Sequence, residues 1–396
     1  MFYCGIDVAK HKHAAVILDD RGRVKRKVFT VDNTQAGLQS LINALKPYEN
    51  NVQIGLEATG HYWLSLDDRL TEYDHPVSVV NPLQVSAYRR SGLRKVKNDS
   101  ADAVWIADFV RISNAPTTSR DTPVLLQLKE LGRFRYHLSD QIGDCKRKLL
   151  TILDRVFPEY EQLFSSVFVT SSRAMLGKAT SAQDFADFDL QELTDLISKT
   201  SRGQFGAAKA RQIQEQARQS VGVSFLADAA KVEIRCLLAQ LELLEAQREE
   251  VARALEKLMA DIPQHITTIP GIGLATGAAM LGEIGDIHRF ESPSKLIAYA
   301  GIDATVYQSG QFKASEAHMS KRGSPYLRLA LWQAALMSTR YDEELKAYYH
   351  KKRAEGKAHG VAIGAVCRKL LIRVYVILKE NRPYEIRKLT PNTLDS

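Results

Sequence analysis

Two long stretches in which apolar residues recur at alternating steps of three and four constrain this chain most. They cover about residues 122–160 and about residues 228–260, with Arg135 and Arg248 as polar interruptions. An average spacing of 3.5 residues is typical of helices that pack as a coiled coil, within one chain or between chains. The apolar positions are Leu128, Leu131, Leu138, Ile142, Cys145, Leu149, Ile152 and Val156 in the first stretch, and Leu237, Leu241, Leu244, Val251, Leu255 and Leu258 in the second.

These stretches divide the 396-residue chain into three expected domains. Residues 1–121 predict an α/β domain, because three strand-like runs are followed by alternating helix and strand patterns. We expect Asp32 or Asn33 to cap the first helix of this domain. Residues 122–260 predict a helical coiled-coil region with a helical insertion at about 165–225. Residues 261–396 predict a mostly helical domain broken by glycine-containing turns.

Composition excludes several classes of protein. No apolar run reaches transmembrane length, and the N-terminus lacks the layout of a signal peptide, so we expect a cytoplasmic protein with no membrane partner. The four cysteines are widely separated, which favours neither a zinc site nor a disulfide framework. Between Gln311 and Arg373 there are 13 Lys or Arg against 5 Asp or Glu, an excess equal to the net charge of +8 of the whole chain. A local basic surface of this kind suits a polyanion.

Four acidic residues form the most informative pattern. Asp7 and Glu57 end two apolar strand runs, where a carboxylate is costly unless it is paired or bound to metal. Asp99 and Asp102 begin a helix three residues apart and therefore share one face. Oxygen ligands suit Mg²⁺ or Mn²⁺, and this order of acids is the one required by a ribonuclease-H-like metal nuclease.

Simpler explanations exist for the same acids. Asp99 and Asp102 also suit helix capping, and Asp7 and Glu57 could be strand-end acids bonded to the backbone. The segment "GIDVAKHKHAAVILDDRG" resembles the first phosphate loop of actin-like sugar kinases as well. The later phosphate and adenosine motifs of those kinases are missing in the expected order, which argues against that interpretation.

Three basic or glycine-containing segments are candidates for nucleic-acid contact. The first is the run before Asp99, with Arg94, Lys95 and Lys97 in addition to Arg89 and Arg90. The second is "IPGIG", where Gly271 and Gly273 would let backbone approach a phosphate at a helix N-terminus, although a tight turn between packed helices explains them equally well. The third is "MSKRGSPYLR", which contributes Lys321, Arg322 and Arg328.

The stretch from Ser309 to Arg328, which includes the last of these segments, contains a helix start and several serine hydroxyl groups. Ser324 is expected to cap a helix that has Pro325 in its first turn. From spacing alone, the nucleophile of a serine-based reaction could be Ser309, Ser315, Ser320 or Ser324, and each is otherwise an ordinary loop hydroxyl.

Together these segments resemble a known family. "GIDVAK", "GLEATG", "VVNP", "KNDSADA", "IPGIG", "GEIGD", "YAGI", "SG" and "MSKRG" occur in an order similar to that of bacterial insertion-sequence transposases. These have a RuvC-like Asp-Glu-Asp-Asp domain and a second domain bearing a serine, and they are recombinases directed by a structured bridge RNA. The resemblance covers roughly residues 3–112 and 262–378, and one departure is Ser315, where related sequences often carry glycine.

The resemblance implies a fold, a chemistry and a set of partners. Residues 1–121 would be a ribonuclease-H-like, RuvC-like domain in which Asp7, Glu57, Asp99 and Asp102 bind Mg²⁺. Ser309 would form a covalent phosphoserine bond to DNA, and Lys321, Arg322 and Arg328 would bind phosphate. The partners would be element-end and target DNA, a guide RNA and further copies in a homodimer or homotetramer, used at the nucleoid.

Two alternatives remain open on the residues alone. A metal-dependent nuclease or junction resolvase would use the four acids and water, leaving Ser309 idle. A non-enzymatic nucleic-acid-binding assembly protein would use only the coiled coil and the basic segments. The acids argue against the second alternative, because removing them would favour polyanion binding.

Overall fold

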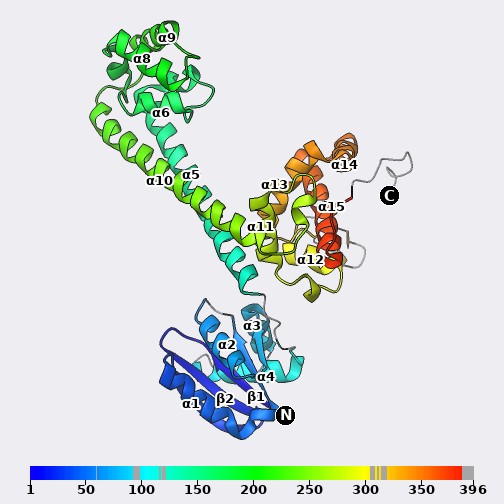
Figure 1. Ribbon diagram of the computed structural model, residues 1–396. Coiled ribbons are helices and arrows are strands. Elements are labelled where there is room, and N and C mark those ends of the chain that lie inside the picture. The colour runs from blue at the N-terminus through cyan, green and yellow to red at the C-terminus, as the bar shows by residue number, and fades with distance from the viewer. Residues whose placement is uncertain are drawn as a thin grey trace. The chain divides into compact units, whose positions relative to one another are not determined.

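The structure is a computed structural model that describes residues 1–58, 60–91, 99–115, 117, 122–303, 308–309, 312–313 and 319–385. Of these, the side chains at positions 50, 83, 91, 99, 100, 308, 309, 312 and 313 are outside the description. The chain forms two compact units, Met1–Arg120 and Asp121–Ser396, which Figure 1 shows in ribbon form.

A five-stranded mixed sheet forms the centre of the first unit. Its order is β3-β2-β1-β4-β5, with β2 antiparallel to both β1 and β3, and with β4 parallel to both β1 and β5. This confirms the α/β pattern expected from the sequence. The strands are β1 (Phe2–Asp7), β2 (Lys12–Asp19), β3 (Val24–Asp32), β4 (Val52–Glu57) and β5 (Val77–Val80).

Helices cover both faces of this sheet. On one face, α1 (Gln35–Leu45) and α2 (Trp63–Glu72) pack on the side chains of Cys4 and Ile6 and their neighbours. On the other face lie α3 (Pro82–Ser91), which the sequence did not predict, and α4 (Asp99–Ser113). A short 3₁₀ helix, η1 (Lys46–Asn51), follows α1.

The N-cap of α1 is Thr34, so the expected cap at Asp32 or Asn33 was wrong. The Thr34 hydroxyl accepts a hydrogen bond from the backbone N–H of Gly37 at 3.1 Å. Asp32 is still part of β3, where it pairs with Lys12 of β2, and the chain turns only after it. The strand therefore extends further than the sequence pattern indicated.

Two 34-residue helices, α5 (Pro123–Val156) and α10 (Ala227–Ala260), lie side by side and antiparallel in the second unit (Figure 1). Ile142 and Cys145 of α5 share a core with Leu241 and Leu244 of α10. Near its start, α5 buries Gly132 and Tyr136 in place of Leu131 and Arg135, which the 3.5-residue spacing had indicated. The reason is that this part of α5 also packs against α11 (Leu274–Ile284) of the C-terminal region.

The chain between α5 and α10 folds as a helical group that shares a core with the end of α5 and the start of α10. Its core surrounds Phe157, Tyr160 and Phe185, and the Tyr160 hydroxyl donates a hydrogen bond to the carbonyl oxygen of Ser172 at 3.1 Å. The elements are η2 (Pro158–Leu163), α6 (Thr170–Leu176), α7 (Ala182–Ala186), α8 (Leu190–Thr200) and α9 (Ala207–Arg218).

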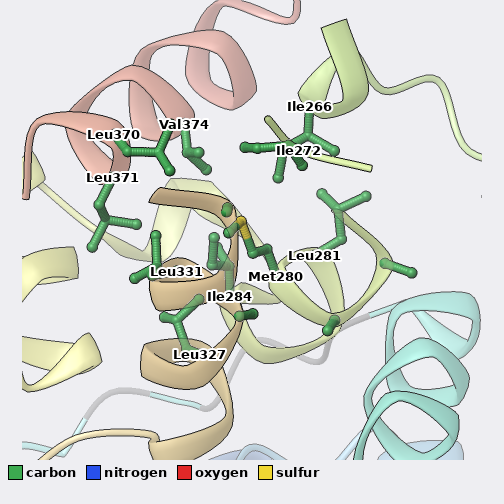
Figure 2. Close-up of a cluster of buried hydrophobic side chains, with 14 of the residues drawn as sticks. Ile266, Ile272, Met280, Leu281, Ile284, Leu327, Leu331, Leu370, Leu371 and Val374 are labelled. Atoms are coloured by element: carbon green, nitrogen blue, oxygen red, sulfur yellow. The ribbon is translucent and has the colours of Figure 1, made fainter. Parts of the chain in front are cut away.

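The C-terminal region is mostly helical, as expected. Figure 2 shows its core, in which Met280 and Ile284 meet Leu327 and Leu331, with Leu370 and Val374 nearby. The elements are η3 (Ile266–Thr268), α11 (Leu274–Ile284), η4 (Ile287–Arg289), α12 (Pro293–Ala300), β6 (Gln308–Ser309), β7 (Phe312–Lys313), α13 (Pro325–Tyr341), α14 (Glu343–Ala354) and α15 (His359–Glu380). Among the described residues, no helix combines the length and apolarity needed to span a bilayer.

Two glycines at the crossing of α5 and α11 provide a test of this packing. A Cβ at Gly282 would lie within 3.0 Å of the backbone of Lys129, whereas a Cβ at Gly132 would meet Ala279 at an ordinary 3.5 Å. We expect Gly282→Ala to destabilise the fold by about 1–3 kcal/mol through overpacking. Gly132→Ala should be neutral or stabilising by up to about 1 kcal/mol, because alanine favours the helix.

Calorimetric melting of both variants beside the wild type checks this prediction. Equal losses of stability in the two variants would contradict the close backbone approach at Gly282.

Candidate active site

Asp7 and Glu57 end two neighbouring parallel strands. The register pairs Ile6 of β1 with Leu56 of β4, so Asp7 and Glu57 are the next residues level with each other. Ile6 and Leu56 both face the core under α1 and α2, and side chains alternate along a strand. The two carboxylates therefore emerge on the opposite face, the one that α4 covers, and both are half-buried.

The approach of α4 to this face depends on glycine. A Cβ at Gly5 would lie within 3.0 Å of the backbone of Ala103 and Ala107, and a Cβ at Gly55 within 3.0 Å of Val110. With no side chains between them, the helix lies directly on the strand backbones.

The direction of α4 follows from its contacts. Tyr3 shares a cluster with Ile106 and Val110, whereas Gly5, two residues further along β1, meets Ala103. Helix and strand therefore run in opposite directions, and the N-terminal end of α4 lies toward the carboxyl ends of β1 and β4. This is the end that carries Asp99 and Asp102.

Asp102 is held by an arginine from α3. The Arg89 guanidinium donates to Asp102 Oδ1 at 2.7 Å, with side-chain exposures of 30% and 21%. Sequence reasoning placed Arg89 only within a basic run. The contact depends on α3, whose last turn contains the first two residues of that run and which was not predicted.

A second network anchors α3 on α4. The Tyr88 hydroxyl donates to Asp108 at 2.7 Å, and Arg111 donates to the other oxygen of the same carboxylate at 2.9 Å. Burial and this hydrogen bond to Asp108 raise the pKa of Tyr88 to about 12, so the phenol keeps its proton. Its ring also packs near Trp105 and Phe109, with centroid separations of 5.8 and 5.7 Å.

The expected metal site is therefore described only in part. Asp99 begins α4, but its side chain is outside the description, as are Arg94, Lys95 and Lys97. Among the described side chains, no group of three or more His, Cys, Asp or Glu is arranged to hold a metal ion. The set of four acids stays a prediction, supported by the shared end of β1, β4 and α4 and by the preference of Mg²⁺ for carboxylate oxygens.

Ser309 belongs to a two-stranded hairpin in the second unit. Ser309 of β6 pairs with Phe312 of β7 in an antiparallel register. Its side chain is outside the description, and Ser315 lies outside the described residues altogether. The backbone places Ser309 at the end of β6, and its role as a nucleophile stays a prediction.

Hydrogen bonds close the segment that contains this hairpin. The Ser320 N–H donates to the Asp303 carbonyl at 2.9 Å, the Ser320 hydroxyl donates to the Asp303 carboxylate, and the Lys321 N–H donates to the Gly301 carbonyl at 3.0 Å. Lys321 has a left-handed φ of 53°. Ser320 thus holds the two ends of this segment together. Because its hydroxyl is already bonded to Asp303, it is a poor candidate for the nucleophile.

Ser324 has the predicted capping role and a second one. Its hydroxyl oxygen accepts from the Leu327 N–H at 3.1 Å and donates to Glu283 Oε2 at 2.7 Å. Lys321 and Arg322 are exposed beside this helix start, where they could meet phosphate. Arg328 donates instead to the Ala300 carbonyl at 3.0 Å, so it helps to hold α12 against α13.

The two glycines of "IPGIG" have different surroundings. Gly271 has a φ of 96°, and a Cβ there would lie within 3.0 Å of Ser338. The Ser338 hydroxyl donates to the Pro270 carbonyl at 2.8 Å, which fixes this turn against α13. Gly273 is exposed at the start of α11, with open space around its Cβ position as far as the described residues extend. Of the two, Gly273 is placed to meet a ligand.

Sequence reasoning missed the buried charge at the centre of this region. Glu283 of α11 is 2% exposed, and Arg133 of α5 donates to its two oxygens at 2.6 and 3.2 Å. The hydrogen bond to Glu283 raises the pKa of the Arg133 guanidinium. Because Ser324 binds the same carboxylate, this one side chain joins α5, α11 and α13. Glu283 in the segment "GEIGD" was the sequence feature that could have indicated this buried charge.

We expect Glu283→Gln to lower the free energy of unfolding by about 3 kcal/mol, because it leaves the guanidinium of Arg133 without its buried partner. The matched control is Glu245→Gln, which alters another two-pronged pair, with Arg173 at 2.6 and 2.9 Å, at a more exposed position. That change should cost about 1 kcal/mol or less. Urea denaturation measures both losses, and a smaller loss for Glu283→Gln than for the control would contradict this assignment.

Two family models match the chain. Residues 4–158 match a model described as "Transposase", and residues 263–350 match one described as "Transposase IS116/IS110/IS902 family". The matched ranges include the strand-end acids and α4 in the first unit, and α11, the Ser309 hairpin and α13 in the second.

The chain is also similar to proteins named as transposases or as a gene-inverting protein. The chain is 27% identical over 390 residues to the pilin gene-inverting protein of Moraxella bovis, covering 97% of this chain and 98% of that protein. It is 27% identical over 391 residues to the transposase for insertion sequence element IS1111A of Coxiella burnetii, covering 96% of this chain and 90% of that protein. A shorter match, 35% over 91 residues, is to the transposase for IS1328 of Yersinia enterocolitica and covers 22% of this chain and 27% of that protein.

Proposed function

Because the chain belongs to the IS110/IS116/IS902 family of transposases, we propose that it cuts and rejoins the DNA strands of an insertion sequence through a bond between Ser309 and DNA. The observation that carries this proposal is the placement of Asp7 and Glu57 beside the N-terminal end of α4. A set of acids at the shared end of two parallel strands and a helix suits a metal-dependent reaction on phosphate. The strand order β3-β2-β1-β4-β5 also suits the ribonuclease-H-like, RuvC-like fold that the sequence predicts.

Asp7, Glu57, Asp99 and Asp102 would hold the metal ion. When bound, Mg²⁺ supplies Lewis-acid stabilisation of the charge that develops on the phosphate under attack. Mn²⁺ shares this preference for oxygen ligands and could replace it.

The proposed reaction exchanges one phosphate ester for another. The Ser309 Oγ attacks the phosphorus of a DNA strand and loses its proton, while the bond from phosphorus to one strand oxygen breaks and that oxygen gains a proton. The hydroxyl of a second strand then attacks the phosphoserine, and the serine oxygen leaves and is protonated again. Each step breaks one ester bond and forms one, so no ATP is needed.

Two groups of basic residues would hold nucleic acid by its backbone. Arg94, Lys95 and Lys97 precede Asp99 and Asp102 in the sequence, and Lys321 and Arg322 are exposed just before the start of α13. Phosphate contacts position a nucleic acid without reading its sequence. The DNA sequences that are joined would then be selected by base pairing with a guide RNA, as the family resemblance implies.

A second copy of the chain would pack on the outer face of α10. Seven apolar residues follow one another there at steps of four and three, and all are exposed: Phe225, Ala229, Val232, Cys236, Ala239, Leu243 and Ala246. Phe225 lies just before the helix and is 82% exposed, and the exposures of Val232 and Leu243 are 64% and 58%. This outer seam is separate from the face that packs on α5. Its spacing and its length of about 30 Å fit a helix from another subunit, which favours a homodimer as the basic unit.

The outer seam predicts a specific cross-link. Cys236 is near the middle of the seam, so it should meet its counterpart in either a parallel or an antiparallel pair, and the other three cysteines are buried. A short bis-maleimide should yield a covalent dimer that is lost in Cys236→Ser. Leu243→Asp should weaken the dimer at least tenfold by placing a charge in the seam, whereas Val221→Asp, at an even more exposed apolar site off the seam, should not.

Sedimentation of the two aspartate variants accompanies the cross-linking. A dimer that survives Leu243→Asp would contradict the seam as the subunit contact.

The covalent step is tested by trapping. Purified protein, Mg²⁺, host RNA and labelled element-junction DNA are mixed, denatured and separated on a gel. We expect a protein–DNA adduct that disappears in Ser309→Ala, because the attacking oxygen is gone, and that falls at least 100-fold in Asp102→Asn, because the site loses a ligand.

Ser320→Ala is the control, since the Ser320 hydroxyl clasps Asp303. It should reduce stability without abolishing the adduct. Cleaved DNA without an adduct, unaffected by Ser309→Ala, would replace this mechanism with a nuclease or resolvase that uses water.

A further inference from the structure

The pairing of Arg89 with Asp102 goes beyond the proposed chemistry. One oxygen of a proposed metal ligand accepts a hydrogen bond from a fixed positive charge at 2.7 Å. Both side chains are partly shielded from solvent, at 30% and 21% exposure, so the attraction is screened less than at an open surface. An arginine that shares a carboxylate with a divalent cation repels that cation.

Arg89 is held in this position by its surroundings. Its neighbour Tyr88 is hydrogen-bonded to Asp108 and packs near Trp105 and Phe109 of α4. Helix α3 therefore cannot slide along α4 without breaking a second, independent contact. The guanidinium therefore stays beside Asp102 in the first turn of α4.

The charges explain why an arginine stands there. Asp7 and Glu57 end neighbouring strands level with each other, and Asp102 lies in the first turn of α4, whose N-terminal end points toward the same end of the sheet. Like charges that are close together destabilise a fold unless a cation compensates them. Arg89 supplies one positive charge that is always present, since a guanidinium does not lose its proton in proteins.

We propose that Arg89 is the internal counter-ion of the carboxylate set, stabilising the protein without metal and lowering the affinity of the set for divalent metal. This inference rests on the proposed role of the four acids. Arg89 is a positioning residue, because it acts on the metal through Asp102. Half-occupancy of the metal site would then require a higher metal concentration than the acids alone dictate.

A merely structural role makes a different prediction. If Arg89 only ties α3 to α4, removing it lowers stability and leaves metal affinity unchanged or weaker. A counter-ion role gives opposite signs: lower stability without metal and tighter metal binding. This opposition makes the proposal testable with the full-length protein and without any activity assay.

The experiment compares three variants with the wild type. Mn²⁺ is titrated into each protein without nucleic acid, and free Mn²⁺ is measured by electron paramagnetic resonance. We expect Arg89→Gln to bind Mn²⁺ about tenfold more tightly, as expected for removing one positive charge several ångströms from a divalent ion in a hydrated site. Arg89→Lys keeps the charge and should bind as the wild type does. Arg90→Gln, an equal loss of charge at the exposed neighbouring position, should also leave the affinity unchanged.

Melting temperatures provide the second readout. Without metal, Arg89→Gln should melt below the wild type, and saturating Mn²⁺ should raise its melting temperature by more than it raises that of the wild type. Equal or weaker Mn²⁺ binding by Arg89→Gln would overturn the counter-ion role. Tighter binding by Arg90→Gln to the same degree would also overturn it, because the effect would then be one of general charge.

Asp102→Asn and Asp7→Asn separate this inference from the function on which it rests. If both lose Mn²⁺ binding while Arg89→Gln does not gain it, the metal site stands and the inference about Arg89 fails. If neither aspartate variant loses binding, the metal site itself is wrong, and the role of Arg89 falls with it.

Discussion

The direct contact between α4 and the bare backbones of Gly5 and Gly55 sets the geometry of the first unit. Any side chain at these positions would push the helix away from the sheet. Because the helix lies so close and runs opposite to β1, its acidic start comes to the same end of the sheet as Asp7 and Glu57. The proposed chemistry therefore depends on two missing side chains as much as on four carboxylates.

In each unit, an acidic residue of one helix forms an ion pair with an arginine from another helix. In the first unit, Arg89 of α3 holds Asp102 of α4, and in the second, Arg133 of α5 holds Glu283 of α11. The two pairs differ in burial, since Glu283 is almost fully enclosed and also binds the N-cap hydroxyl of α13. Under the proposal above, the first pair, whose side chains are 30% and 21% exposed, exchanges its cation for a metal at modest cost. The second pair is a fixed structural joint, because without Arg133 a buried carboxylate would lose its charged partner.

The sequence predicted the elements better than their contacts. The five strands of the first unit and the Ser324 cap follow from alternation and local capping chemistry, which a short window of sequence contains. Helix α3 was missed because its basic last turn resembled part of a charged run. The pairing of Arg133 with Glu283 spans 150 residues, and no local pattern could have shown it. The acids were found as candidates, whereas the arginine that holds Asp102 became visible only once α3 was in place.

The antiparallel course of α5 and α10 has a consequence for the length of the chain. The end of α5 and the start of α10 meet at one end of the helix pair, where a connection of about 2–5 residues suffices to reverse direction. The antiparallel pairing of α5 and α10 thus does not require the helical group that is inserted between them. A shortened variant that closes this hairpin directly, with polar residues replacing the apolar side chains that the group covers, would leave the strand-end acids and the Ser309 hairpin on their original supports. The helical group between α5 and α10 is therefore the part of the chain whose removal would shorten the protein.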